Sequence, residues 1–139
     1  EVDRGQYDKV NLEVDFVSGC CFLLSKDAFQ KIGLFDSRYY LYFEDVDFSQ
    51  RAKKLGFKLK LVPEAVIWHL NSASSSPNSH LQNYFITRNR LLFGFNYAST
   101  RAKFALFRES IKFLFSNDYW RRIAVRDYYL GRLGRGSWQ

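Results

Sequence analysis

The sequence contains no methionine, two prolines and only two cysteines, the adjacent Cys20 and Cys21, in 139 residues. Neighbouring cysteines cannot build a disulfide framework, so we expect a reducing compartment. No apolar run approaches the roughly 20 residues of a membrane-spanning helix. No charged-then-apolar leader opens the chain, so no signal peptide is predicted. Because the chain starts Glu-Val-Asp-Arg, we expect a piece of a longer protein.

Composition and charge describe a folded chain with two unlike halves. Apolar residues make up 47% and aromatic residues 19%, which excludes disorder, collagen-like repeats and a disulfide-stapled miniprotein. The net charge of +7 lies in the second half: residues 1–75 carry 10 Lys+Arg and 11 Asp+Glu, whereas residues 76–139 carry 11 and 3. A polar stretch at residues 71–79 lies between them. We therefore predict domains at 1–75 and 76–139.

The first half alternates predicted strands and short helices. Residues 14–24, 57–61 and 65–69 are apolar or alternate apolar with polar, as strands do. Ser25 is placed to cap a helix that Gly33 ends, and a second helix over residues 45–55 stops at Gly56. Its buried face is predicted to hold Phe48, Ala52 and Leu55. This order predicts an α/β fold.

The second half is predicted to be helical. One apolar stripe follows helical spacing from Leu81 to Phe95, and a second runs from Phe104 to Phe115 with basic residues facing it. A third helix is predicted from an Asn117 cap to Leu130.

An acidic cluster at the start of the second predicted helix is the first candidate for chemistry. Glu44, Asp45 and Asp47 directly follow the aromatic run of residues 39–43. Acids in a first turn complement the helix dipole, and Asp47 with Arg51 has the spacing of an i,i+4 ion pair, so a purely structural interpretation stands. The aromatic setting favours another, because desolvation beside paired carboxylates raises a pKa as a general base requires.

The two histidines carry little signal by themselves. His69 ends a predicted strand and His80 follows a loop, and either is more often structural than a metal ligand. Two histidines without a cysteine pair cannot form a closed zinc site, so any metal would need oxygen ligands from elsewhere.

Taken together, these residues resemble the inverting family-2 glycosyltransferases, particularly the rhamnosyltransferase-like branch. Order and spacing fit over residues 14–93. The matching motifs are Val17-Ser18-Gly19, Gly33-Leu34-Phe35-Asp36, Phe43-Glu44-Asp45-Val46-Asp47, Arg51, Gly56, Pro63-Glu64-Ala65, His69, Tyr84 and Arg88-Asn89.

The resemblance assigns roles to the acidic motif and its surroundings. It makes Asp45 the base that deprotonates an acceptor hydroxyl, with Glu44 beside it to orient the acceptor or raise the pKa of Asp45. Asp36 would contact the acceptor, and Gly19 would let the backbone approach the sugar. Arg51 is expected to be structural, holding Asp47 or Glu44. Cys20 and Cys21 occupy a stretch that is usually small or apolar in the family, so both are expected in the core.

The resemblance also implies the ligands that the remaining residues bind. His69 matches the position of a third ligand to a divalent Mg or Mn ion that neutralises the departing diphosphate. Arg88 and Asn89 would lie near the diphosphate or the acceptor. The family's Asp-x-Asp metal motif and glycine-rich phosphate loop are missing, so most metal ligands would lie outside this chain.

The fold class implied is α/β: the acceptor-binding half of a nucleotide-diphospho-sugar transferase fold followed by a helical C-terminal extension. Its partners would be a nucleotide-diphospho-sugar donor and a polysaccharide or lipid-linked acceptor of the cell envelope. The expected location is cytoplasmic, peripheral on the inner face of the cell membrane. Without the nucleotide-binding half, we expect the isolated chain to be inactive and, through its exposed sheet edge, to self-associate.

The basic, aromatic residues 100–139 leave three interpretations open. They form either a helical hairpin with a solvated basic face or a surface for anionic membranes. Nucleic-acid binding is disfavoured, because no such motif is present and the charges are dispersed. For the whole chain, the alternatives to glycosyl transfer are a metal-dependent hydrolase built on Glu44, Asp45, Asp47 and His69, and a non-catalytic membrane-surface module.

Overall fold

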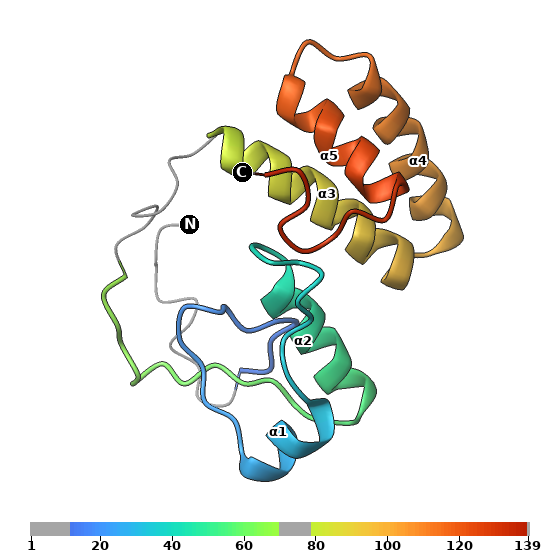
Figure 1. The fold of residues 1–139 in the computed structure, drawn as a ribbon. Helices are drawn as coiled ribbons and strands as arrows, with labels where there is room; N and C mark the ends of the chain where they lie inside the picture. Colours follow the sequence, from blue (N-terminus) through green and yellow to red (C-terminus); the bar gives the residue numbers. More distant parts are fainter. Residues whose placement is uncertain (1–11, 70–78, 139) are drawn as a thin grey trace. The chain divides into compact units, whose positions relative to one another are not determined.

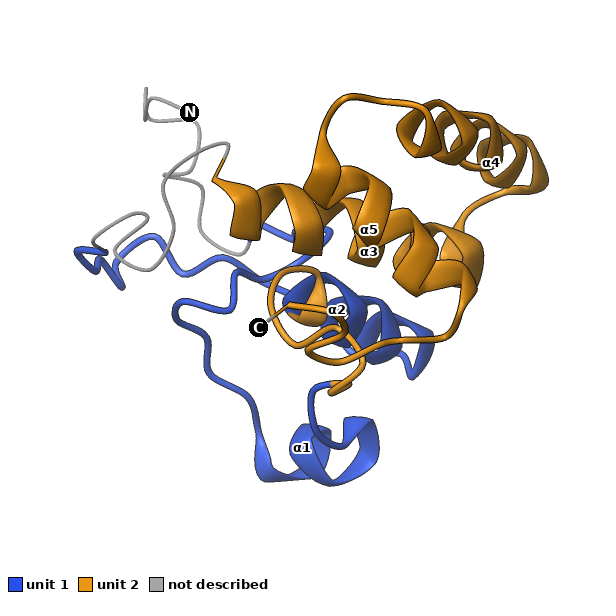
Figure 2. Ribbon diagram, turned by 45° about the horizontal axis from the view of Figure 1, so that its top comes forward, with its two compact units in different colours: residues 1–35, 45–70 blue, residues 36–44, 71–139 orange. Residues whose placement is uncertain are grey.

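The computed structural model describes residues 12–69 and 79–138, which contain the five helices labelled in Figure 1. The chain forms two compact units, coloured in Figure 2. The first consists of residues 1–35 and 45–70, and the second of residues 36–44 and 71–139. Residues 36–44 thus belong with the C-terminal helices, a grouping that the sequence analysis did not include. Each unit is described by itself.

The first unit contains α1 (Lys26–Ile32) and most of α2 (Glu44–Lys54). Ser25 caps α1 through its hydroxyl, which accepts a hydrogen bond from the Ala28 amide, and Gly33 ends the helix at φ 79°. Gly56 has φ 83° just beyond α2. Both predicted helices and their end signals are therefore confirmed.

The core of the first unit lies between α1, α2 and the chain segments beside them. Ala28 and Ile32 from α1 meet Phe48 and Ala52 from α2, and Phe22 and Leu59 pack against this cluster. The burial of Phe48 and Ala52 follows the predicted face. Leu55, predicted on the same face, is half exposed because α2 has already ended at Lys54.

The predicted strands are not formed within residues 12–69. Residues 57–61 meet the segment before residue 15 in a single antiparallel bridge between Glu13 and Lys60. The Val14 amide donates to Leu59 O at 3.0 Å, and the Leu61 amide to Leu12 O at 2.9 Å. A regular strand needs a neighbour along its whole length, and the described part of this unit provides one only here. The α/β assignment is therefore unconfirmed.

The cysteines correct a second expectation. Cys20 and Cys21 are both exposed, although we predicted them in the core. They lie in a turn at residues 19–21 rather than in a buried strand, so the local turn explains their exposure.

The second unit is a helical hairpin laid against a longer helix (Figure 1): α3 (His80–Tyr97), α4 (Thr100–Leu114) and α5 (Tyr119–Tyr129). Ser79, Ser99 and Asp118 cap them by accepting from backbone amides three residues on. The third predicted helix therefore begins one residue later than expected, because Asp118 and not Asn117 supplies the capping oxygen. Among the described residues, none of the helices has both the length and the apolar content needed to cross a membrane.

The core of the second unit is aromatic. Tyr84 and Phe85 from α3 are fully buried with Ala124 from α5, and Trp120 and Trp138 pack beside them. This confirms the buried stripe predicted for residues 81–95. The stripe on α4 differs, because Phe104, Phe107 and Ile111 remain exposed.

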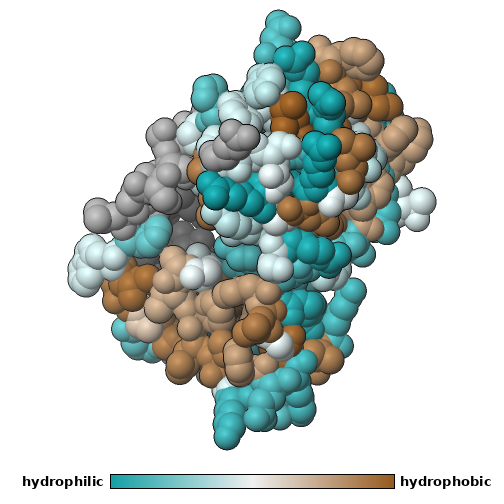
Figure 3. Space-filling view, in the orientation of Figure 1, coloured by the Kyte–Doolittle hydropathy of each residue, from teal (hydrophilic) through white to brown (hydrophobic). Residues whose placement is uncertain are grey.

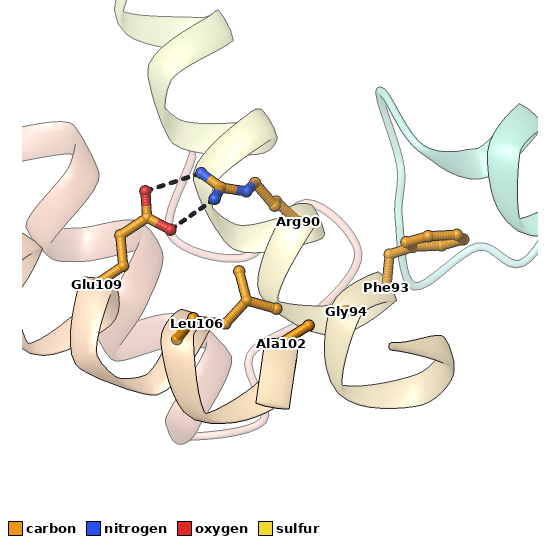
Figure 4. A pocket seen from close by; sticks show the side chains of 7 residues that line it. Arg90, Phe93, Gly94, Ala102, Leu106 and Glu109 are labelled. Atoms are coloured by element: carbon orange, nitrogen blue, oxygen red, sulfur yellow. Dashed lines mark hydrogen bonds and ion pairs between the residues drawn. The ribbon is translucent and has the colours of Figure 1, made fainter. Parts of the chain in front are cut away.

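α3 and α4 approach each other closely at one glycine. A Cβ on Gly94 would lie 2.2 Å from Leu106 Cδ1, so a larger residue fits here only if the Leu106 side chain moves aside. A shallow groove of about 280 Å³ opens beside this contact, and Arg90 binds Glu109 across it with hydrogen bonds of 2.9 and 2.6 Å (Figure 4). The contact and the ion pair together fix the register of the two helices.

Candidate active site

The side chain of Asp45 lies at the start of α2 and is anchored by two backbone amides. Its Oδ2 accepts a hydrogen bond from the Gly19 amide at 2.9 Å, and its Oδ1 accepts from the Val46 amide at 2.8 Å. A carboxylate has about four acceptor positions, so each oxygen retains one for another donor. The residue is half-buried. The side chain of Asp45 is therefore held in one orientation.

Ser49, one turn further along α2, binds both the start of α2 and the segment around Val17. Its hydroxyl donates to the Asp45 carbonyl at 2.7 Å and accepts from the Val17 amide at 3.1 Å, and the residue is fully buried. Together with the bond from Gly19, this ties residues 17–19 to the first two turns of α2. The sequence analysis missed Ser49; its i+4 spacing from Asp45 is the signal that could have found it.

The loop that leads into Glu44 and Asp45 has a rare backbone conformation. Tyr40, Tyr42 and Phe43 have φ angles of 63°, 65° and 72°. This left-handed region is unfavourable for bulky residues and persists only where the surroundings impose it. Glu44, half-buried, begins α2 immediately after the last of them. The left-handed backbone of this loop therefore ends directly before Glu44, the first residue of α2.

Asn89 on α3 holds that loop. Its Nδ2 lies 2.8, 2.7 and 2.8 Å from the carbonyl oxygens of Tyr39, Leu41 and Tyr42. Its Oδ1 accepts from the guanidinium of Arg88 at 3.0 and 3.1 Å. Both the nitrogen and the oxygen of this buried side-chain amide are thus hydrogen-bonded, which fixes its orientation. Asn89, which the resemblance placed near a ligand, contacts the backbone of the loop.

Arg88 is fully buried and serves the same loop. Its Nη2 donates to Tyr39 O at 3.0 Å and Arg38 O at 3.3 Å, and its guanidinium lies over the Phe85 ring at 5.0 Å. Burial lowers the pKa of Arg88. Keeping a guanidinium out of water is costly unless its donors are satisfied, and here the loop carbonyls satisfy them.

Asp127, a buried acid on α5, extends the hydrogen bonds around Arg88 towards the C-terminal residues. Asp127 on α5 accepts hydrogen bonds from the Tyr84 hydroxyl and, at 2.8 Å, from the Ser137 amide. Burial, followed by the hydrogen bond to Asp127, raises the pKa of Tyr84 to about 12. The Tyr84 hydroxyl also accepts from Arg88 at 3.4 Å. Residues near the end of the chain are thereby linked to the loop before the acidic pair.

Asp36 and Asp47 each bind an arginine. Asp36 accepts from Arg38 at 2.6–3.0 Å, so this candidate acceptor contact already has a cationic partner. Asp47 is buried and accepts from Arg51 Nε at 2.8 Å, while Arg51 also donates to the carbonyl oxygens of Ile32 and Leu34. The predicted structural role of Arg51 as the partner of Asp47 is confirmed.

His69 and Gly19 complete the predicted set. His69 is exposed at the end of the described segment 12–69. Within the two described ranges, no three His, Cys, Asp or Glu side chains come together as metal ligands. The donor set present does not by itself fit a divalent metal. Gly19 has space for a Cβ at ordinary contact distance from Asp45, so its amide, rather than its missing side chain, is what Asp45 requires.

Comparison with known proteins identifies the class to which this arrangement belongs. The chain is a member of the family described as glycosyltransferase like family 2, whose model matches residues 4–94. This confirms the resemblance inferred from the motifs between Val17 and Asn89. α4 and α5 lie beyond the matched residues.

Two curated relatives are similar over part of the chain. They are the proteins named N-acetylglucosaminyl-diphospho-decaprenol L-rhamnosyltransferase from two strains of Mycobacterium tuberculosis, CDC 1551 / Oshkosh and ATCC 25618 / H37Rv. Each is 41% identical over 70 residues, which make up 49% of this chain and 23% of the relative. The chain thus matches about a quarter of the length of these relatives. No solved structure matches it significantly.

Proposed function

We propose that this chain is the acceptor-binding and catalytic-base part of an inverting glycosyltransferase that uses a nucleotide-diphospho-sugar donor. The single observation that carries the proposal is the fixed carboxylate of Asp45 at the start of α2, in a chain of this family. Each of its two oxygens accepts one hydrogen bond from a backbone amide and can accept one more. Family membership also favours transfer over the metal-dependent hydrolase and the non-catalytic module considered above.

The proposed reaction is the inverting transfer that the family resemblance implies. An acceptor hydroxyl attacks the anomeric carbon of the donor sugar, a carbon–oxygen bond forms, and the bond to the nucleotide diphosphate breaks on the opposite face. A hydroxyl with a pKa near about 15 loses its proton only as the new bond forms, so a positioned base is required. Asp45 takes that proton and Glu44, its neighbour, orients the acceptor, while the Gly19 amide holds the Asp45 carboxylate in place.

We assign Arg88 and Asn89 to positioning rather than to contact with a ligand. Their side-chain groups bind the carbonyl oxygens of residues 38–42, directly before the acidic pair. The effect of either residue on transfer is then exerted through the loop.

The acceptor class follows from the relatives, whose name specifies a diphospho-decaprenol substrate. We infer a saccharide carried on a lipid diphosphate, used at the cytoplasmic face of a membrane in cell-envelope polysaccharide synthesis. A divalent metal would neutralise the leaving diphosphate when bound. His69 would supply one ligand to it, and we infer that most of the others belong to residues outside this chain.

The role of Asp45 is tested in a chimera in which residues 4–94 replace the matching region of the mycobacterial relative. Asp45→Asn is expected to lower the transfer rate about 10²–10⁴-fold, the usual contribution of a general base. Asp27→Asn, an exposed acid on α1, is the matched control and should transfer normally. Unchanged transfer by Asp45→Asn in an active chimera would refute the assignment.

The division of labour between this chain and the rest of the enzyme is tested by calorimetric titration with nucleoside diphosphates and Mn²⁺. We expect no tight binding by the chain alone. Tight, metal-dependent binding would mean that this chain holds a complete nucleotide site, and would contradict the division proposed here.

A further inference from the structure

The outward side of α4 carries a row of apolar side chains that the second unit leaves uncovered. Phe104, Phe107 and Ile111 are 64%, 45% and 40% exposed, and Phe115, the C-cap, is 84% exposed. These four residues are called the α4 outer face. At about 100° per residue they occupy an arc of about 80° on one side of the helix. Figure 3 shows apolar groups over α4 beside hydrophilic ones.

The opposite side of α4 does the packing within the unit. Leu106 meets Gly94 on α3, Ser110 shares a 2.8 Å hydrogen bond with the Tyr129 hydroxyl on α5, and Phe113 lies under the Arg121 guanidinium at 5.4 Å. The hairpin is therefore held together without the α4 outer face, which leaves that face available to a partner.

Basic residues border the α4 outer face. Arg101, Arg108 and Lys112 are exposed, and on the helical wheel they occupy the next 60° or so of the surface. The only acid of α4, Glu109, is turned the other way and paired with Arg90 (Figure 4). A partner for this surface has to provide apolar contact together with negative charge.

Two copies that meet through their α4 outer faces do not supply that charge, because each face brings the same cations and no acid. An anionic lipid surface supplies both. Phenylalanine and isoleucine enter the boundary between headgroups and acyl chains, while arginine and lysine extend their long stems to the phosphates. The strong positive charge of residues 76–139 adds long-range attraction.

We propose that α4 binds flat on an anionic membrane through its outer face, with Arg101, Arg108 and Lys112 on lipid phosphates. The proposal rests on these residues alone and stands independently of the transfer reaction. It goes beyond the family match, which ends at residue 94, before α4 begins.

The test is co-sedimentation of the full chain with vesicles of phosphatidylcholine alone and of phosphatidylcholine mixed with phosphatidylglycerol. Binding is expected only to the anionic vesicles, and it should weaken as salt is added. The double variant Phe107→Ser/Ile111→Ser should lose about tenfold or more in partition coefficient, because both groups lose their apolar contact. Arg108→Gln/Lys112→Gln should lose about tenfold or more on anionic vesicles, since each basic residue contributes separately.

Leu23→Ser is the matched control, because Leu23 is a 99% exposed apolar residue of the first unit. It should bind vesicles like the parent chain, and circular dichroism should show equal helicity in all variants. The charge variant alters only exposed positions, so it decides the matter even if the apolar variant fails to fold. Equal binding to neutral vesicles, no binding, or full binding by the charge variant would overturn the proposal. So would an α4 variant that changes only self-association in light scattering.

Discussion

At the scale of single residues, the buried amide of Asn89 holds the loop that precedes the acidic pair. Three aromatic residues of the loop have left-handed backbones, and each such residue costs about 1–3 kcal/mol. Asn89 compensates for this by binding three loop carbonyls at once. A side chain without an amide donor cannot replace it.

Asn89→Ala is therefore expected to lower the free energy of unfolding by about 2–4 kcal/mol, because several buried carbonyls lose their donor. Asn89→Asp should be at least as harmful, since a carboxylate of the same shape would face those carbonyl oxygens. Asn96→Ala, at an exposed position on the same helix, should change stability by less than about 0.5 kcal/mol. Urea unfolding measures all three. Equal effects at positions 89 and 96 would contradict the role assigned to Asn89.

Tyr84 predicts a dependence on alkaline pH. In the unfolded chain its pKa is 10.0, whereas in the folded chain it is raised to about 12. Below pH 10 both states keep the proton and the contribution of Tyr84 to stability is complete. As pH rises from 10 towards 12, the unfolded state loses its proton first, so stability falls, by on the order of 2 kcal/mol. Urea unfolding of Tyr84→Phe should show a shallower decline over this range. An identical slope would show that another group is responsible.

At the scale of elements, one close contact fixes the packing within each unit. Within the first unit, Ser49 and Asp45 bind residues 17–19 to α2. Within the second unit, Gly94 lets α3 and α4 approach until Leu106 touches the α3 backbone. α4 therefore packs directly against α3, the helix that carries Asn89.

Gly94→Ala tests the helix contact. A Cβ that would lie 2.2 Å from Leu106 Cδ1 pushes the end of that side chain aside. We expect this to lower the unfolding free energy by about 1 kcal/mol, because an overpacking cost of about 1–3 kcal/mol is partly offset by the better helix propensity of alanine. In a Leu106→Ala background the same change should be neutral or stabilising, because the clashing methyl is gone. A double-mutant cycle from chemical denaturation measures this coupling. A coupling near zero would contradict the contact.

At the scale of the whole molecule, locally encoded features were predictable from the sequence and distant ones were not. Ser25 and Gly33 mark the ends of α1 because a cap acts within three or four residues. The bonds from Asn89 to Tyr39 span 50 residues, and nothing in the local pattern indicates them.

The predicted strands show why features that depend on distant residues could not be predicted. Residues 57–61 have the alternation of a strand, but strand structure requires hydrogen bonds from neighbours. The described residues supply only the Glu13–Lys60 bridge. Because the chain covers 23% of its curated relatives, we propose that the missing neighbours belong to the rest of the domain.

This incomplete pairing leads to a prediction about association. Leu23 and Trp68 are 99% and 94% exposed, and such surface is usually covered in a folded protein. We expect the isolated chain to self-associate at micromolar concentration, with a mass in light scattering that rises with concentration. Leu23→Ser/Trp68→Ser should reduce that rise, whereas the exposed polar change Gln30→Ser should not. A monodisperse monomer of the parent chain would contradict the prediction.

The bonds between Asn89 and the loop also order events in time as the protein is made. Translation proceeds at about 5–20 residues per second, so Asn89 is added roughly 2–10 s after Tyr42. Until then the donor that stabilises the left-handed conformations of Tyr40, Tyr42 and Phe43 does not exist, and the nascent loop stays in ordinary extended or helical backbone. The loop that leads into Glu44 therefore takes its final conformation only after α3 has been synthesised, several seconds after the loop itself.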